Sequence, residues 1–124
     1  VLRVKERKGK IFVILDAGMN DLIRPALYSA YHEIIPLNDE TEECTVDVVG
    51  PLCEDGDFLA RDRKMRKVKT GDLVIVENVG AYGFSMSSNY NARLRAAEVL
   101  INGGDIRLIR KRETFEDLIK NQII

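Results

Sequence analysis

A thiol and three carboxylates lie within five residues of one another, directly after a Gly-Pro pair that is typical of a turn. These residues are Cys53, Glu54, Asp55 and Asp57. The carboxylates disfavour a further anion beside them, so we expect the thiol to stay protonated. A protonated thiol argues against nucleophilic catalysis and leaves proton donation as its chemistry. The alternative is that Cys53 is a small buried apolar group, which is the commoner role of a lone cysteine.

A second stretch, residues 80–91, is expected to form a loop and carries two tyrosines among small and polar side chains. Tyr82 and Tyr90 suit recognition of a polar ligand or of a partner chain in this setting. Packing at the edge of a β fold explains them equally well. The glycines of this stretch do not have the spacing of a phosphate-binding P-loop, so that class of site is excluded.

Arg24 and Tyr28 lie four residues apart, so they share one face of a short helix. Pro25 is tolerated only in a first helical turn, which predicts a helix that starts near residues 22–24. Asp21 is the candidate N-cap of this helix. A surface arginine that leans on the tyrosine ring is the simpler interpretation of the pair.

The one histidine and the second cysteine belong to no recognisable motif. His32 has no serine or cysteine partner at a motif spacing, and Cys44 and Cys53 lack the CxxC spacing of a zinc site. Without a signal peptide, reduced thiols in a cytoplasmic protein are the simpler expectation than a disulfide. A net charge of -1 gives no basic excess for nucleic-acid binding, and no apolar run is long enough to span a membrane.

Short strands with frequent turns predict the fold that must hold these groups. Residues 1–6 and 11–15 form a hairpin around Gly9, which is free to take a positive φ. Further strands are expected at residues 31–37, 45–49, 73–79, 96–102 and 106–109, with a tight hairpin turn at residues 102–105, and a helix at residues 113–119. No strand–helix alternation of the kind that builds a parallel sheet is present. The expected fold class is mainly β, a Greek-key-like sandwich or barrel with one or two short helices, in a single domain over residues 1–124.

Several segments, in this order, resemble the C-terminal β domain of diaminopimelate decarboxylases. They are LDAGMNDLIRPALY at residues 15–28, His32, GPLCEDGD at residues 50–57, GAY at residues 80–82, NYN at residues 89–91 and AEV at residues 97–99. The first segment is specific within the pyridoxal-phosphate decarboxylases of alanine-racemase-like architecture. Ornithine and arginine decarboxylases share the cysteine loop and the GAY element but not this first segment.

The resemblance implies a longer enzyme, and the abrupt start at Val1 without a methionine fits that expectation. The full enzyme would convert meso-diaminopimelate to L-lysine and CO2 in cytoplasmic lysine biosynthesis. An N-terminal TIM-like barrel, absent from this chain, would carry the Schiff-base lysine for pyridoxal 5'-phosphate. Two chains would form a homodimer in which each β domain completes a shared active site.

The resemblance also implies a role for each candidate residue. Arg24 and Tyr28 would bind the distal carboxylate of the substrate, and arginine suits this because its planar fork binds carboxylates bidentately. Glu54 would pair with the distal ammonium across the dimer interface. Cys53 would return a proton to the substrate carbon after CO2 has left. Tyr82 would contact the cofactor or its phosphate.

Asp57 is expected to order its loop instead of contacting the substrate. Two alternatives stay open. One is a decarboxylase of the same class that acts on another basic amino acid. The other is a stand-alone β module that binds ligands or partners without catalysis.

Overall fold

Strands dominate both of the compact units into which the chain divides. The computed structural model describes residues 1–123, without the side chain of Ala81. The first unit is Val1–Ser87 and the second begins at Ser88. Because the helices are short and the strands predominate, the prediction of a mainly β fold is confirmed. No helix among the described residues has the length and apolar character needed to cross a membrane.

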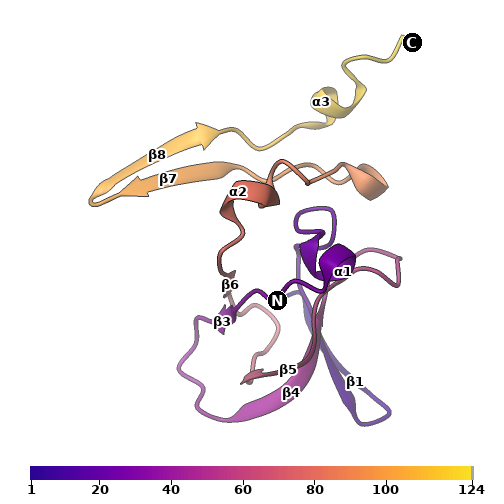
Figure 1. Cartoon of the computed structure of the whole chain (residues 1–124), viewed down its shortest axis with the longest axis vertical. Coiled ribbons are helices and arrows are strands. Elements are labelled where there is room, and N and C mark those ends of the chain that lie inside the picture. Colours follow the sequence, from indigo (N-terminus) through magenta and orange to yellow (C-terminus); the bar gives the residue numbers. More distant parts are fainter. Residues whose placement is uncertain (124) are drawn as a thin grey trace. The chain divides into compact units, whose positions relative to one another are not determined.

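The first unit contains most of the sheet structure (Figure 1). Its elements are β1 (Arg3–Arg7), β2 (Lys10–Ile14), α1 (Arg24–Tyr28), β3 (Ile34–Pro36), β4 (Glu43–Val49), β5 (Phe58–Arg66), β6 (Val74–Val76) and α2 (Gly80–Gly83). Strands β1, β2, β4 and β5 form one sheet in that order, and β3 pairs with β6. The hairpin of β1 and β2 turns through Lys8 and Gly9, whose φ angles are 52° and 75°. The expected hairpin around Gly9 is therefore confirmed.

One strand pair departs from the expected antiparallel arrangement. β2 and β4 are parallel neighbours, with Ile11 opposite Val46 and Ile14 opposite Val49. The chain makes this crossover through α1 and β3, since parallel strands need a long connection between them. The expectation that no parallel pairing would form is therefore wrong at this pair.

The helix α1 begins where Pro25 allows it, at Arg24. Its N-cap is Ile23, with no side-chain capping bond, so the expected cap by Asp21 is wrong. Asp21 instead accepts a hydrogen bond from the Gly18 N–H at 3.0 Å, which closes a turn before the helix. The helix ends at Ser29, whose left-handed φ of 53° cannot continue it.

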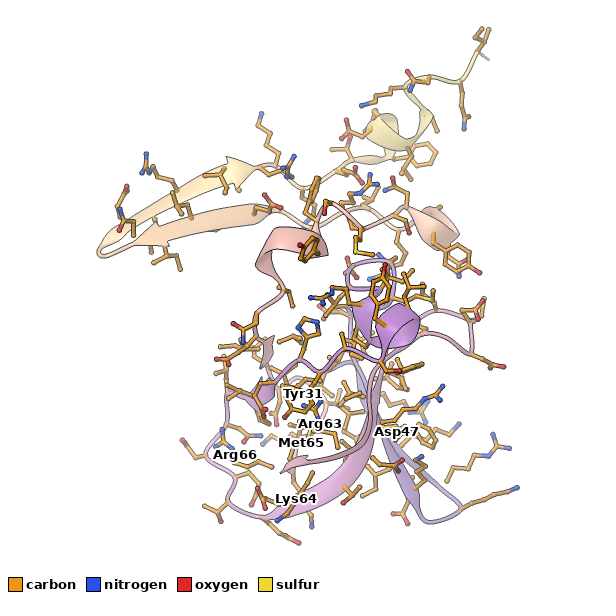
Figure 2. The ribbon with its side chains drawn as sticks, in the orientation of Figure 1. Tyr31, Asp47, Arg63, Lys64, Met65 and Arg66 are labelled. Atoms are coloured by element: carbon orange, nitrogen blue, oxygen red, sulfur yellow. The ribbon has the colours of Figure 1, made fainter. Side chains whose placement is uncertain are left out.

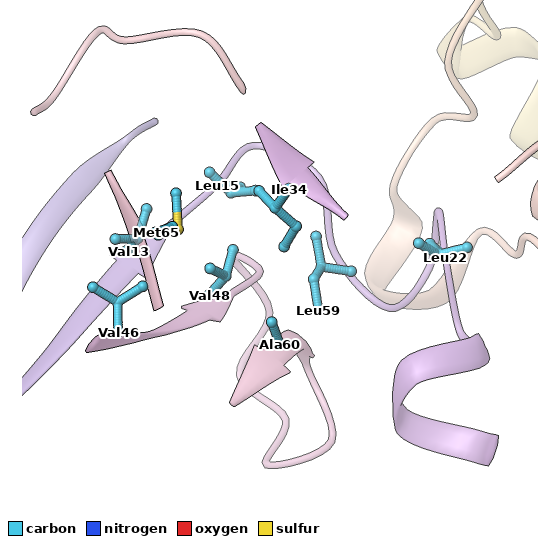
Figure 3. Close-up of a cluster of buried hydrophobic side chains, with 9 residues drawn as sticks. All are labelled: Val13, Leu15, Leu22, Ile34, Val46, Val48, Leu59, Ala60 and Met65. Atoms are coloured by element: carbon cyan, nitrogen blue, oxygen red, sulfur yellow. The ribbon is translucent and has the colours of Figure 1, made fainter. Parts of the chain in front are cut away.

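The core of the first unit is built from inward-facing side chains of β2, β4 and β5 and of the segments around α1 and β3 (Figure 3). Its members are Val13, Leu15, Leu22, Ile34, Val46, Val48, Leu59, Ala60 and Met65. Val48 is fully buried, and Val13 and Val46 are nearly so. Burying side chains of this size contributes about 1.5–3 kcal/mol each, which holds β2 and β4 together as a rigid support for the loops that follow them.

The basic residues of β5 line a polar face of the sheet. The Arg63 guanidinium lies 4.0 Å from the centre of the Tyr31 ring, and the two side chains adjoin in Figure 2. Lys64 pairs with Glu43 at 2.8 Å across the β4–β5 ladder. Arg66 donates a hydrogen bond to the Asn38 carbonyl oxygen at 2.6 Å. These cations are therefore engaged in contacts within the unit.

The second unit is a hairpin flanked by short helical turns. Its elements are the 3-10 turn η1 (Tyr90–Ala92), β7 (Glu98–Asn102), β8 (Asp105–Arg110) and α3 (Phe115–Ile119). The tight turn expected at residues 102–105 is confirmed, with Gly103 at a φ of 60°. Thr114 caps α3 through a capping box with Asp117. Cross-strand pairing places an apolar set, Val99, Ile101, Ile106 and Leu108, on one face of the hairpin, and all four are exposed.

Candidate functional site

The parallel pairing of β2 and β4 brings the two loops with chemical groups to the same edge of the sheet. Ile14 and Val49 are opposite each other at the carboxyl ends of these strands. The Leu15 N–H donates to the Val49 carbonyl oxygen at 2.9 Å, so the two segments that follow β2 and β4 leave the sheet side by side. The loop after β2 leads to α1, and the loop after β4 carries Cys53. No local sequence pattern indicates this neighbourhood, because it depends on a pairing between distant segments.

Arg24 and Tyr82 meet in the first unit. The guanidinium carbon of Arg24 lies 5.3 Å from the centre of the Tyr82 ring, within the range of a cation–π contact. Arg24 is half-buried at the start of α1, and Tyr82 is 59% exposed in α2. Two of the candidate residues therefore form one contact, although nothing in their sequence spacing indicated it.

The stretch expected to be a loop at residues 80–91 begins with a helical turn. In α2 the Gly83 N–H donates to the Val79 carbonyl oxygen at 2.8 Å. The Met86 N–H then donates to the carbonyl oxygen of Tyr82 at 3.0 Å. The turn fixes the backbone of Tyr82 while its phenol stays accessible. The prediction of a loop is therefore wrong at residues 80–83, which form α2.

The loop after β4 presents its thiol at the surface. Cys53 is exposed, which contradicts the alternative of a small buried apolar group. Glu54 is exposed and its Oε1 accepts the Gly56 N–H at 3.2 Å. Asp57, in contrast, is only 4% exposed, so it is the buried member of this acidic group.

The remaining candidate residues differ in their exposure and in the unit to which they belong. Tyr28 is 62% exposed at the end of α1. His32 is buried, and its Nδ1 lies 3.0 Å from the Glu77 carbonyl oxygen, which makes Nδ1 the donor nitrogen. The Nε2 atom of His32 is buried without a partner among the described residues. Tyr90 belongs to the second unit, where η1 holds it in a partly exposed position.

Three of the lysines are held as ammonium ions by neighbouring carboxylates. Hydrogen bonds to Asp47 and Asp62 raise the pKa of Lys10. Glu43 raises the pKa of Lys64 in the same way. A raised pKa opposes the neutral amine that Schiff-base chemistry requires. Lys67, whose pKa a hydrogen bond to Glu42 raises, fits this description as well.

Comparison with known proteins matches this architecture to a single family. Residues 1–80 match the pyridoxal-dependent decarboxylase C-terminal sheet domain. The chain belongs to this domain family, which agrees with the resemblance noted in the sequence.

Particular relatives carry a more specific name. The chain is 52% identical to a diaminopimelate decarboxylase of Aquifex aeolicus over 94% of this chain and 28% of that protein. It is 53% identical to one of Campylobacter jejuni over 96% of this chain and 30% of that protein. The crystal structure of diaminopimelate decarboxylase from M. jannaschii in co-complex with L-lysine superposes with a TM-score of 0.95 at 47% identity, covering 100% of this chain and 29% of that chain. The chain thus spans under a third of the length of the relatives it matches.

The cofactor of this family is pyridoxal phosphate, and the described residues fit a supporting role toward it. An exposed phenol at Tyr82 and a guanidinium at Arg24 are suitable donors for an anionic group. No carboxylate among residues 1–123 pairs with Arg24, so its hydrogen-bonding fork is not used by a protein anion.

Proposed function

We propose that this chain is the C-terminal domain of a diaminopimelate decarboxylase, which converts meso-diaminopimelate to L-lysine and CO2. The observation that carries the proposal is the state of Arg24. The residue is half-buried, and its guanidinium faces the Tyr82 ring and has no carboxylate partner in the described part of the chain. Partial burial of an unpaired cation costs free energy, so such a group is suited to receive an anion from a ligand.

Diaminopimelate differs from lysine and ornithine in the number of its carboxylates. One carboxylate leaves as CO2, and a second, at the other end of the molecule, remains in the product. A site for this substrate needs a fixed cation at some distance from the reacting carbon, and Arg24 supplies one. A relative solved with L-lysine bound supports this choice, because the product keeps that second carboxylate.

The other candidate residues take complementary roles in the proposal. Cys53, exposed on the loop after β4, donates a proton to the carbon that has lost CO2. Glu54 on the same loop receives the distal ammonium, and Tyr28 lies one helical turn from Arg24 to assist in carboxylate binding. Tyr82 contacts the cofactor. When bound, pyridoxal phosphate supplies the electron sink of the reaction, and the protein supplies orientation and charge.

The missing parts of the site come from outside this chain in the proposal. The Schiff-base lysine belongs to an N-terminal barrel, and a homodimer joins the Cys53 loop of one chain to the barrel of its partner. The exposure of Cys53, Glu54 and Tyr82 supports this arrangement, because catalytic groups work best in a site closed to water.

Release of CO2 by the full-length protein tests the proposal. Purified protein with pyridoxal phosphate is given meso-diaminopimelate, L-lysine or L-ornithine at equal concentrations. We expect the largest kcat/KM with diaminopimelate. Faster turnover of ornithine or lysine would indicate a decarboxylase of another basic amino acid, and no release from any of the three would favour a non-catalytic β module.

A further inference from the structure

Asp57 connects the two loops that carry the candidate residues. Its Oδ1 accepts the Met19 N–H at 2.7 Å, and its Oδ2 accepts the Leu52 N–H at 2.6 Å. Met19 lies in the loop after β2, and Leu52 lies in the loop after β4. One buried carboxylate therefore takes one backbone donor from each loop, and both of its oxygens are used.

Two glycines make room for this carboxylate. A Cβ atom at Gly18 would lie 2.5 Å from Asp57 Oδ1, and a Cβ at Gly50 would lie 2.5 Å from the Gly18 Cα as well as against the carboxylate. Neither glycine has a positive φ. Their small size is thus required by the close approach of the two loops, and not by an unusual backbone conformation.

Backbone hydrogen bonds link Asp57 and Gly18 to the loop that contains Cys53 and to the segment that precedes α1. The Gly50 N–H donates to the Asp57 carbonyl oxygen at 3.0 Å, and the Asp57 N–H donates to the Glu54 carbonyl oxygen at 3.0 Å, which closes the loop that contains Cys53. On the other side, the Gly18 carbonyl oxygen accepts the Leu22 N–H at 3.0 Å, two residues before α1 begins at Arg24.

We propose that Asp57 is a positioning residue that fixes the position of Cys53 relative to Arg24. The inference rests on the proposed function and adds to it a residue that contacts neither substrate nor cofactor. A shift of about 1 Å in a positioned group can cost on the order of 100-fold in rate. Loss of the Asp57 connection should therefore impair proton donation and carboxylate binding together.

Asp57→Asn is a sharp test because it keeps the shape of the side chain. The amide has one acceptor oxygen, so its NH2 group must face either the Met19 or the Leu52 N–H, donor against donor. Asp47→Asn is the matched control. Asp47 is also buried, at 6% exposure, and accepts the Asp62 N–H at 2.7 Å, but it lies within β4 and holds neither loop.

The experiment uses the full-length enzyme with pyridoxal phosphate and measures kcat and KM in a double-mutant cycle. We expect Asp57→Asn to lower kcat about 10- to 100-fold and to raise the KM for diaminopimelate about tenfold. In a Cys53→Ala background the further loss of kcat should fall below about threefold, because Asp57 then has no thiol left to position. In an Arg24→Ala background the rise in KM should disappear in the same way. If Asp57 only stabilised the fold, Asp57→Asn would lower kcat and raise KM by the same factors in the Cys53→Ala and Arg24→Ala backgrounds as in the wild type. That result would overturn the inference.

Hydrogen exchange in the same proteins gives a readout that does not depend on activity. Asp57→Asn should speed exchange in residues 16–23 and 50–57 together, and Asp47→Asn should leave both segments unchanged. Faster exchange in one segment alone, or equal effects of the two substitutions, would contradict the inference. If the wild-type enzyme releases no CO2 from diaminopimelate, the proposed function fails, while this measurement still decides whether Asp57 joins the loops. Gly18→Ala, which displaces the carboxylate but keeps both donors, replaces Asp57→Asn if that variant does not fold.

Discussion

The guanidinium of Arg24 lies over the ring of Tyr82, 5.3 Å from its centre, although the two residues belong to segments far apart in the sequence. The contact orients the cation without using its five N–H donors. An aromatic face is a weak partner compared with a carboxylate, about 0.5–2 kcal/mol. The arginine is therefore held in place and still available to a ligand, which is the property that the proposed function needs.

Arg24→Ala in the full-length enzyme should raise the KM for diaminopimelate about 10- to 100-fold, since a hydrogen bond to a charged group contributes about 1.5–3 kcal/mol. The value of kcat should change little, because the distal carboxylate is bound equally in the ground state and the transition state. Arg24→Lys should recover only part of the loss, because it lacks the bidentate fork. A fall in kcat at unchanged KM would contradict this role.

Cys53→Ala should lower kcat by about 10²- to 10⁴-fold, the usual contribution of a positioned acid or base, with little change in KM. Cys44→Ala is the control, since Cys44 lies half-buried in β4 and packs against the core. Steady-state kinetics of both variants test the assignment. Equal losses in the two variants would show that a general loss of stability, and not proton donation, is the cause.

The two loops illustrate which parts of this site can be predicted from sequence. Local signals were sufficient for the turn at Gly9 and for the start of α1 near Pro25, because each depends on neighbouring residues. The acidic cysteine loop was found because its Gly-Pro pair and charges are adjacent in the chain. Cys53 was left open as either a proton donor or a buried apolar group, and its exposure excludes the second.

What sequence reasoning missed depends on contacts between distant segments. The parallel pairing of β2 with β4 is set by the packing of Val13, Val46 and Val48 in the core, and nothing in the local pattern distinguishes it from antiparallel pairing. Asp57 was expected to order its own loop, but its second partner, the Met19 N–H, lies in another loop.

Glu113 should make the second unit sensitive to acid. A hydrogen bond from the Arg95 N–H lowers the pKa of Glu113, and the side chains of Asn89 and Arg95 lower it further. A carboxyl with a lowered folded-state pKa stabilises the fold above its unfolded value, and that contribution is lost as the pH falls through the folded-state pKa. The stabilising contribution of Glu113 should therefore begin to fall below the ordinary carboxyl pKa of about 4.3.

Hydrogen exchange at residues 88–95, followed from pH 6 to about pH 3 with correction for intrinsic rates, checks this dependence. Glu113→Gln should remove most of the pH dependence, because exchange in these residues is then fast at every pH. Glu98→Gln is the control, because Glu98 pairs with Arg110 in the hairpin and does not contact Asn89. An unchanged pH profile in Glu113→Gln would assign the acid sensitivity to other groups.

This chain alone should not bind pyridoxal phosphate covalently at one defined lysine. Lys10 and Lys64 are paired with carboxylates that raise their pKa values, so neither provides the neutral amine of a Schiff base. Borohydride reduction followed by peptide mapping should show weak labelling spread over several lysines. A single, stoichiometrically labelled lysine would contradict the assignment of the covalent anchor to another domain.

Binding of L-lysine and of cadaverine to the full-length protein tests most directly whether Arg24 receives the retained carboxylate. The two ligands share the carbon chain and the amino groups, but only L-lysine has a carboxylate. Calorimetric titration of wild type and Arg24→Ala with each ligand should show L-lysine affinity reduced about 10- to 100-fold by the substitution, with cadaverine affinity unchanged. Equal effects on the two ligands, or none on L-lysine, would contradict the account.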